Sequence, residues 1–146
     1  MEKIFLILIC LALILFFLTP RTDKNHQIKI KINQSIIDAE VADNPLARYR
    51  GLSNRPDLCE KCGMLFVFPI KVTQIFSMRR MIFPLDIIWL DGNKIIKIDK
   101  NLLPEDADYK HTYSSSAPSN RVLEVNAGFC DKNNINVNDE ITIYPK

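Results

Sequence analysis

The sequence predicts a single all-β domain, a small antiparallel β-sandwich or barrel with one short helix, preceded by an N-terminal hydrophobic helix. First, short apolar or alternating segments recur between turn residues, which indicates roughly seven to nine short strands. Second, long amphipathic segments that would predict a parallel α/β sheet do not occur between them. Third, a chain of 146 residues with 47% hydrophobic residues accommodates one core.

The N-terminus carries an uninterrupted apolar run over residues 4–18, followed by Thr19 and Pro20. Such a run is typical of a secretory signal or a short membrane anchor, whereas a buried core helix would normally show a polar face. Bulky residues stand where a signal peptidase prefers small ones, so an uncleaved anchor is favoured. We expect residues 1–20 to be a signal peptide or membrane anchor that contacts the membrane through the apolar run.

Behind this segment, residues 21–26 are polar and are expected to form a tether, and residues 27–146 the β-sandwich domain. Because a signal-like segment precedes it, we expect the domain to be extracytoplasmic, and secreted if the leader is cleaved. The chain has 19 Lys and Arg against 17 Asp and Glu, interleaved along the sequence. This balance predicts no basic face, so we expect no nucleic-acid partner.

The first elements of the domain follow from local patterns. Residues 27–32 alternate isoleucine with polar side chains, which predicts a half-buried strand, and residues 36–41 form its returning partner. Asn44 and Pro45 then start a brief helix that ends at Gly51.

A hairpin is expected where two apolar runs, residues 85–90 and 95–98, flank the turn sequence Asp-Gly-Asn-Lys at 91–94. Asp-Gly is favoured in tight turns that need positive φ. Residues 99–120 form a long surface excursion. The other expected strands cover residues 64–68, 75–78, 122–125 and 141–144.

Five short motifs occur in a fixed order along the domain. They are Arg50-Gly51-Leu52 with Arg55, GMLFVF at 63–68, FSM at 76–78, PLDIIWL at 84–90 and LEVNAG at 123–128. In this order they resemble the family known as domain of unknown function 192, and the resemblance spans roughly residues 36 to 143. It implies a small β-sandwich or barrel that is often exported and has no established activity, so it implies fold and location without a reaction.

Three positions depart from the family pattern. Ser53 stands where the family usually has methionine, Ser77 where it has tryptophan, and Asn138 replaces a turn glycine. If that tryptophan lines a pocket in the family, the pocket of this chain is larger or differently filled.

The motif Cys59-Glu-Lys-Cys62 has the spacing of half a zinc site. Cys130 and His111 are the residues that would complete a metal site. The same pair could instead form a structural disulfide or remain inert thiols, which we favour. Thiol-disulfide exchange is a third possibility, although a strand rather than a helix follows the motif.

Asp86 lies between apolar residues of an expected buried strand. A buried carboxylate requires a partner, and the nearest cationic candidates by motif are Arg79, Arg80 and Arg50. Glu124 raises the same question. Two carboxylates facing one pocket would permit general acid-base chemistry, which makes a hydrolase that uses Asp86 and Glu124 the third hypothesis.

The sequence therefore predicts a binding domain rather than an enzyme, with a small polar ligand or a partner protein as its target and no cofactor. A metal-binding or thiol-disulfide protein using Cys59, Cys62 and Cys130, with zinc as the metal, is the alternative. The expected recognition surface includes the loop over residues 104–120. Its ligand-binding residues are Arg79, Arg80, Asp86, Glu124, Tyr109 and Tyr113.

Overall fold

The computed structural model describes residues 27–108 and 110–145. The predicted anchor at residues 1–20 and the tether at 21–26 therefore lie outside the described residues. Within the described ranges, no helix is long and apolar enough to cross a membrane.

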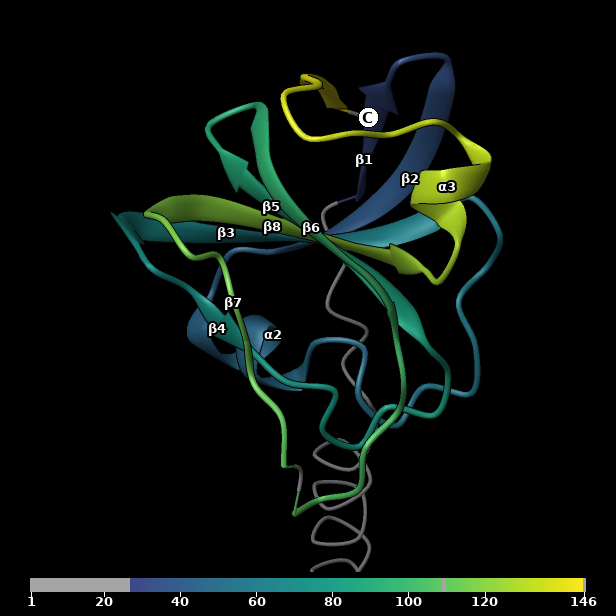
Figure 1. Cartoon of the computed structure of the whole chain (residues 1–146), viewed down its shortest axis with the longest axis vertical. Coiled ribbons are helices and arrows are strands. Elements are labelled where there is room, and N and C mark those ends of the chain that lie inside the picture. The colour runs from purple at the N-terminus through teal and green to yellow at the C-terminus, as the bar shows by residue number, and fades with distance from the viewer. Residues whose placement is uncertain (1–26, 109, 146) are drawn as a thin grey trace, which may run out of the picture.

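Seven strands form one curled sheet in the order β6-β5-β8-β3-β2-β1-β9 (Figure 1). Strands β2 and β3 pair in parallel, and every other neighbouring pair of this sheet is antiparallel. The strands are β1 (Gln27–Ile32), β2 (Ser35–Ala42), β3 (Cys62–Val72), β5 (Leu85–Asp91), β6 (Lys94–Leu102), β8 (Ser119–Asn126) and β9 (Ile141–Pro145).

A second, two-stranded sheet pairs β4 (Ile75–Phe76) with β7 (Tyr113–Ser114). Two short helices complete the described residues, α2 (Pro45–Arg50) and α3 (Phe129–Lys132). The predicted all-β character is confirmed. The predicted antiparallel sandwich or barrel with one helix is corrected to a mixed, curled sheet with a small second sheet and two helices.

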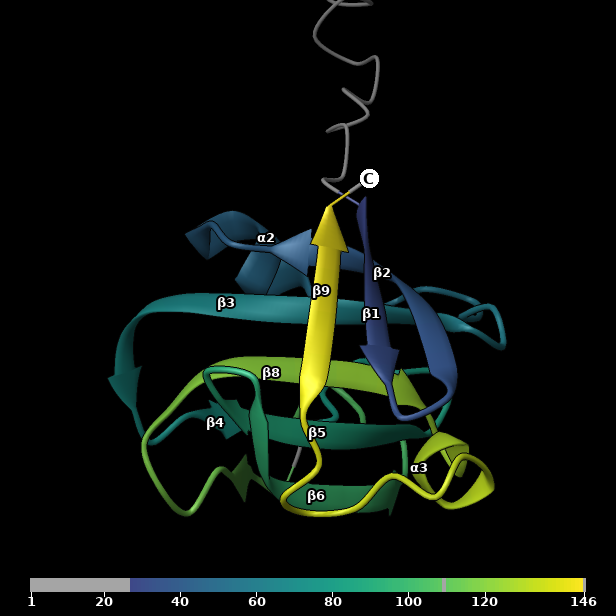
Figure 2. The ribbon, with the colours of Figure 1, turned by 90° about the horizontal axis from the view of Figure 1, so that it is seen from above.

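The curl brings the two edges of the large sheet together at one end (Figure 2). The Ile95 N–H donates to the Asp139 carbonyl at 2.9 Å, and the Ile141 N–H donates to the Asn93 carbonyl at 2.9 Å. These bonds join the start of β6 to the start of β9, which leaves the sheet as a half-barrel.

Strands β3, β8 and β5 separate two hydrophobic cores, with α3 on one side of them and α2 and the small sheet on the other (Figure 1). The core on the α3 side, here called the upper core, contains the isoleucines of β1, Leu123 and Val125 of β8, and Phe129 and Cys130 of α3. The core on the side of α2 and the small sheet, here called the lower core, contains Trp89 of β5 together with aromatic and methionine side chains from β3 and the loops. Residues 122–125 of β8 are buried because alternate side chains enter opposite cores.

Local sequence accounts for the elements that were predicted. In β1 the isoleucines are buried and the intervening residues exposed, as the alternation requires. Gly92 has φ +59 in the tight turn between β5 and β6. At the start of α2, the Asn44 side chain accepts a hydrogen bond from the Ala47 N–H at 2.9 Å, which caps the helix before Pro45.

Candidate functional site

Glu124 is a buried carboxyl group at the floor of an open cleft. Strand β8 places it opposite Met64 of β3 and Ile87 of β5, so its side chain points towards the lower core. It is only 5% exposed, yet no hydrogen bond reaches its carboxyl oxygens from any described residue. The cleft has a volume of about 390 Å³ and lies between α2, β3 and β4. This volume is within the range of small-molecule sites.

Burial raises the pKa of Glu124 to about 8, and the positive charge of Arg55 opposes this increase. Arg55 is itself held by Glu40, whose two carboxylate oxygens accept from the guanidinium at 2.5 and 2.8 Å. The floor of the cleft therefore carries a largely neutral carboxylic acid at pH 7. Such a group both donates and accepts hydrogen bonds.

Three phenylalanines line one wall of the cleft. The ring of Phe76 packs edge-on against Phe66, with centroids 4.9 Å apart, and against Phe68 at 6.2 Å. Ser77 lines the same space. The position at which the family resemblance implies tryptophan thus faces the cleft, and a serine there leaves more room for a ligand.

Arginine side chains also border the cleft. The guanidinium of Arg48 donates to the carbonyls of Asp43 and Val67, at 2.6 and 2.9 Å, and lies over the Phe68 ring, 5.3 Å from its centroid. Arg79 lies over the Tyr49 ring, 5.1 Å from its centroid. Arg50 is exposed at the end of α2. All three face the cleft.

The predicted ligand-binding residues are distributed over several places. Arg79 and Glu124 line the cleft, and Arg80 lines an adjoining hollow. Tyr113 in β7 packs partly buried against the lower core. Tyr109 lies outside the described residues. The first part of the predicted loop forms a separate hollow, lined by Met81 and by residues 104–106, 108 and 110.

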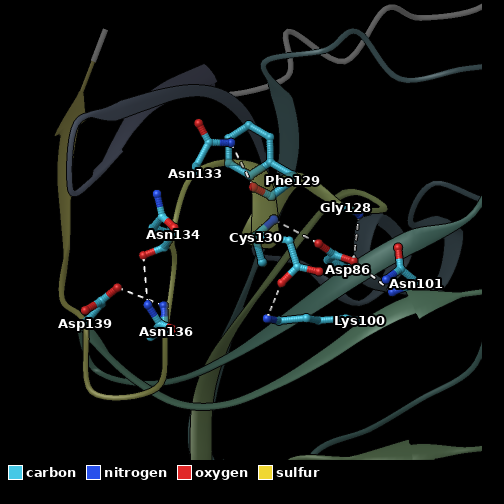
Figure 3. Close-up of polar contacts among 11 residues, drawn as sticks. Asp86, Lys100, Asn101, Gly128, Phe129, Cys130, Asn133, Asn134, Asn136 and Asp139 are labelled. Carbon is cyan, nitrogen blue, oxygen red and sulfur yellow. Dashed lines mark hydrogen bonds and ion pairs between the residues drawn. The ribbon is translucent and has the colours of Figure 1, made fainter.

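Asp86 is fully buried on the other side of the sheet, and backbone groups rather than an arginine satisfy it (Figure 3). One carboxylate oxygen accepts from the N–H groups of Asn101 and Gly128 at 2.8 and 3.1 Å, and the other from the Cys130 N–H at 3.0 Å. Asn101 and Gly128 both have positive φ. The predicted arginine partner is therefore wrong, and Asp86 fixes two left-handed turns and α3 against β5.

The register between β5 and β8 contradicts the hypothesis of a hydrolase that uses Asp86 and Glu124 together. Asp86 pairs with Val125, whereas Glu124 pairs with Ile87. Because paired residues share a face and successive residues alternate, the two carboxyl groups project from opposite faces of the sheet. They cannot act on one substrate, and the expectation of a shared pocket is wrong.

The cysteines do not converge on a metal site. Cys59 and Cys62 form a disulfide bond, which confirms the structural alternative for this motif. Cys130 is a buried free thiol in the upper core, and His111 is exposed and contacts Glu105. No group of three metal-ligating side chains occurs in the part of the chain that the structure describes. The predicted zinc site is therefore not formed by these four residues.

Sequence reasoning missed most of the cleft. Arg48, Tyr49, Phe68 and Phe76 were not expected to contribute, because they come from three separate elements, α2, β3 and β4, that surround one cavity. The only local signal was the Arg-Tyr-Arg sequence that precedes Gly51, where an exposed aromatic lies between two cations.

The comparisons with known proteins agree on the fold. A family model described as "Uncharacterized ACR" matches residues 27–143, and no curated protein matches. A chain from Sinorhizobium meliloti 1021, provisionally described as a transcription regulator, superposes with a TM-score of 0.73 at 24% identity and covers 80% of this chain and 92% of its own. A protein of unknown function from Novosphingobium aromaticivorans DSM 12444 superposes with a TM-score of 0.71 at 24% identity. The match covers 80% of this chain and 83% of that protein.

Proposed function

The chain belongs to the DUF192 family, and from this premise we propose that it binds a small polar ligand in the cleft above Glu124. The carboxyl group of Glu124 carries the proposal. It is buried, it faces the cleft, and it receives no hydrogen bond from the described residues. The carboxyl oxygens are open to the cleft rather than sealed off from it. A ligand that replaces water there would hydrogen-bond to a carboxyl group in a largely desolvated environment, where such bonds are strong.

The surroundings of the carboxyl group support binding rather than catalysis. A second carboxyl group does not line the cleft in the described residues, and neither does a histidine or a cysteine. Aromatic side chains and guanidinium groups around the cleft provide shape and hydrogen-bond donors. This is the arrangement expected of a binding site that orients a small molecule without reacting with it.

A thermal-shift screen of the full chain in detergent, read by the fluorescence of its single tryptophan, tests the proposal. We expect some compounds of a small polar panel to raise the melting temperature of the wild type. Ser77→Phe should abolish that rise by filling the cleft, whereas Thr142→Phe, at an exposed position on the edge strand β9 that does not line the cleft, should retain it. Equal stabilisation of both variants, or no stabilising compound, would refute ligand binding in the cleft.

We further propose that the domain is held at a membrane on its extracytoplasmic side. The apolar run at residues 4–18 and the Cys59–Cys62 disulfide both support this location, since disulfides persist mainly in oxidising compartments. Deleting residues 1–20 should move the protein from the membrane to the soluble fraction. Protection of the intact chain from protease added to the outer face would contradict the proposed side. Binding of a partner protein and thiol exchange at the disulfide stay predictions.

A further inference from the structure

The cleft continues into a second hollow, so the site has two compartments. The hollow has a volume of about 370 Å³ and shares Tyr49, Arg50, Gly51, Ser53 and Arg79 with the cleft. The first compartment is bounded by the phenylalanines and Glu124. The second is bounded by the shared residues together with Arg55 and Arg80. We call them the aromatic compartment and the arginine compartment.

The arginine compartment carries an excess of positive charge. Arg50, Arg79 and Arg80 form no ion pair with any carboxylate among the described residues, whereas Arg55 is neutralised by Glu40. No acidic side chain of the described residues lines this compartment. Glu124 in the neighbouring compartment adds little negative charge at pH 7, since burial raises its pKa to about 8. The chain as a whole has a net charge of only +2, so this local excess is not a general property of the surface.

The backbone that carries two of these arginines is held in place from both sides. The Arg80 N–H donates to the Glu105 carbonyl at 2.8 Å, and the Arg80 carbonyl accepts from the Asn54 N–H at 2.8 Å. The Ser53 hydroxyl donates to the Arg79 carbonyl at 3.0 Å. The backbone of Arg80 also has φ +56, a value that residues other than glycine adopt rarely and that the surrounding structure must hold in place. The segment is therefore preorganised, which reduces the entropy cost of placing its guanidinium groups around a ligand.

The aromatic compartment has a different character. The rings of Phe66, Phe68 and Phe76 offer an apolar wall, and Ser77 leaves space beside it. The ring of Tyr49, fixed beneath Arg79, lies at the boundary between the two compartments. Arg48 also lines this compartment, but its guanidinium donates to two backbone carbonyls and lies over Phe68. A ligand that is apolar at one end and negatively charged at the other therefore fits both compartments.

We infer, building on the proposed function, that the ligand is an amphiphilic organic anion. Its apolar body lies in the aromatic compartment, and its carboxylate or phosphate group accepts hydrogen bonds from Arg50, Arg79 and Arg80. Planar guanidinium groups suit both anions because they can donate two parallel hydrogen bonds to one oxygen pair.

Isothermal titration of the full chain in detergent, with a detergent blank, tests this assignment with matched probes. We expect 3-phenylpropionate and phenyl phosphate to bind at least tenfold more tightly than 3-phenyl-1-propanol, which lacks the charge. Acetate and inorganic phosphate, which lack the apolar body, should also bind at least tenfold more weakly. The tighter of the two anions identifies the group that the arginines prefer.

Variants locate the binding. Arg50→Gln/Arg79→Gln should weaken binding of the anionic probes at least tenfold and leave the weak binding of the alcohol unchanged. Lys31→Gln, an exposed change on β1, removes a positive charge elsewhere and should have no effect. Side-chain Nε–Hε NMR signals of Arg50, Arg79 and Arg80 should shift with the anions, while that of Arg121, hydrogen-bonded to Gly92 and Asn93, should not. The same spectra show whether the double variant is folded.

Three results would overturn the inference. Equal affinity for the alcohol and the anions would show that charge is not recognised, while leaving the cleft as a binding site. Equal affinity for inorganic phosphate and phenyl phosphate would show that the aromatic compartment has no role. Failure of every anionic probe would reject the ligand class. If polar compounds still stabilise the wild type but not Ser77→Phe, the proposed function survives that failure.

Discussion

Replacing Glu124 with glutamine should stabilise the protein at pH 8 and have little effect at pH 4. The substitution keeps the shape of the side chain and removes its ability to ionise. Burial raises the pKa of Glu124 from 4.5 to about 8 in the folded state. The folded protein therefore retains a proton that the unfolded chain releases between these two pH values.

The sign and size of the effect follow from this difference. The wild type has its full stability below pH 4.5 and loses stability progressively as the pH rises towards 8. Each unit of pKa difference corresponds to 1.36 kcal/mol, so the complete loss is about 5 kcal/mol, of which about 3 kcal/mol has occurred at pH 7. Glu124→Gln avoids this loss, and its advantage over the wild type should grow along the same curve.

Urea unfolding of the full chain from pH 4 to pH 8.5 under non-reducing conditions measures the effect. Trp89, the single tryptophan, is fully buried in the lower core and reports unfolding. The chain has two histidines, and histidine side chains commonly titrate in the same range, so both proteins should carry His26→Gln and His111→Gln. Burial raises the pKa of the Cys130 thiol above its usual range, so the unfolded chain loses this proton first as the pH approaches 9. Both proteins carry this thiol, so its contribution cancels when their curves are compared.

Parallel stability curves for the wild type and Glu124→Gln across this pH range would refute the reasoning. That result would mean that Glu124 is ionised in the folded protein at pH 7 without a large cost. The aromatic compartment would then contain a full negative charge, and the selectivity for anions proposed for the neighbouring arginine compartment would need a different explanation.

Three other substitutions test the framework around the cleft, each by its urea midpoint. Asp86→Asn should cost about 2–4 kcal/mol, because an amide cannot accept all three backbone hydrogen bonds; a loss below about 0.5 kcal/mol would contradict the anchoring role. Replacing Cys59 and Cys62 by serine should cost about 2 kcal/mol for so short a loop, and an unchanged midpoint would exclude a stabilising disulfide. Gly63→Ala should cost about 1–3 kcal/mol, because the new Cβ would lie 2.8 Å from the Glu124 carbonyl oxygen; wild-type stability would show that the strands can separate freely there.

The sequence was informative where structure depends on neighbouring residues. The alternation in β1, the Asp-Gly turn before β6 and the Asn44 cap of α2 each act over a few positions, and each was predicted. Helix α3 was missed because its four residues show no helical period and no side-chain cap. The parallel pairing of β2 with β3 was also missed, since a pairing across a 19-residue connection has no local signature.

The candidate site shows the same limit. Burial of Asp86 could be predicted from its apolar neighbours, but its partners could not. The partners are backbone N–H groups at positions 101, 128 and 130, and nearly every residue type has such a group, so the sequence does not mark them. The opposite orientations of Asp86 and Glu124 depend on a register that sequence does not reveal. Only the side-chain types, and not the distances between them, were available in advance.

The separation of the two cores by β3, β8 and β5 has a consequence for engineering. The Asp86 network that holds α3 lies on one side of these strands, and the cleft with Glu124 lies on the other. Changes at the rim of the cleft, for example at Arg48 or Ser77, touch none of the groups that bind Asp86, so their effects on stability should add independently. New specificities could thus be selected on one side of the domain while its scaffold is left intact on the other.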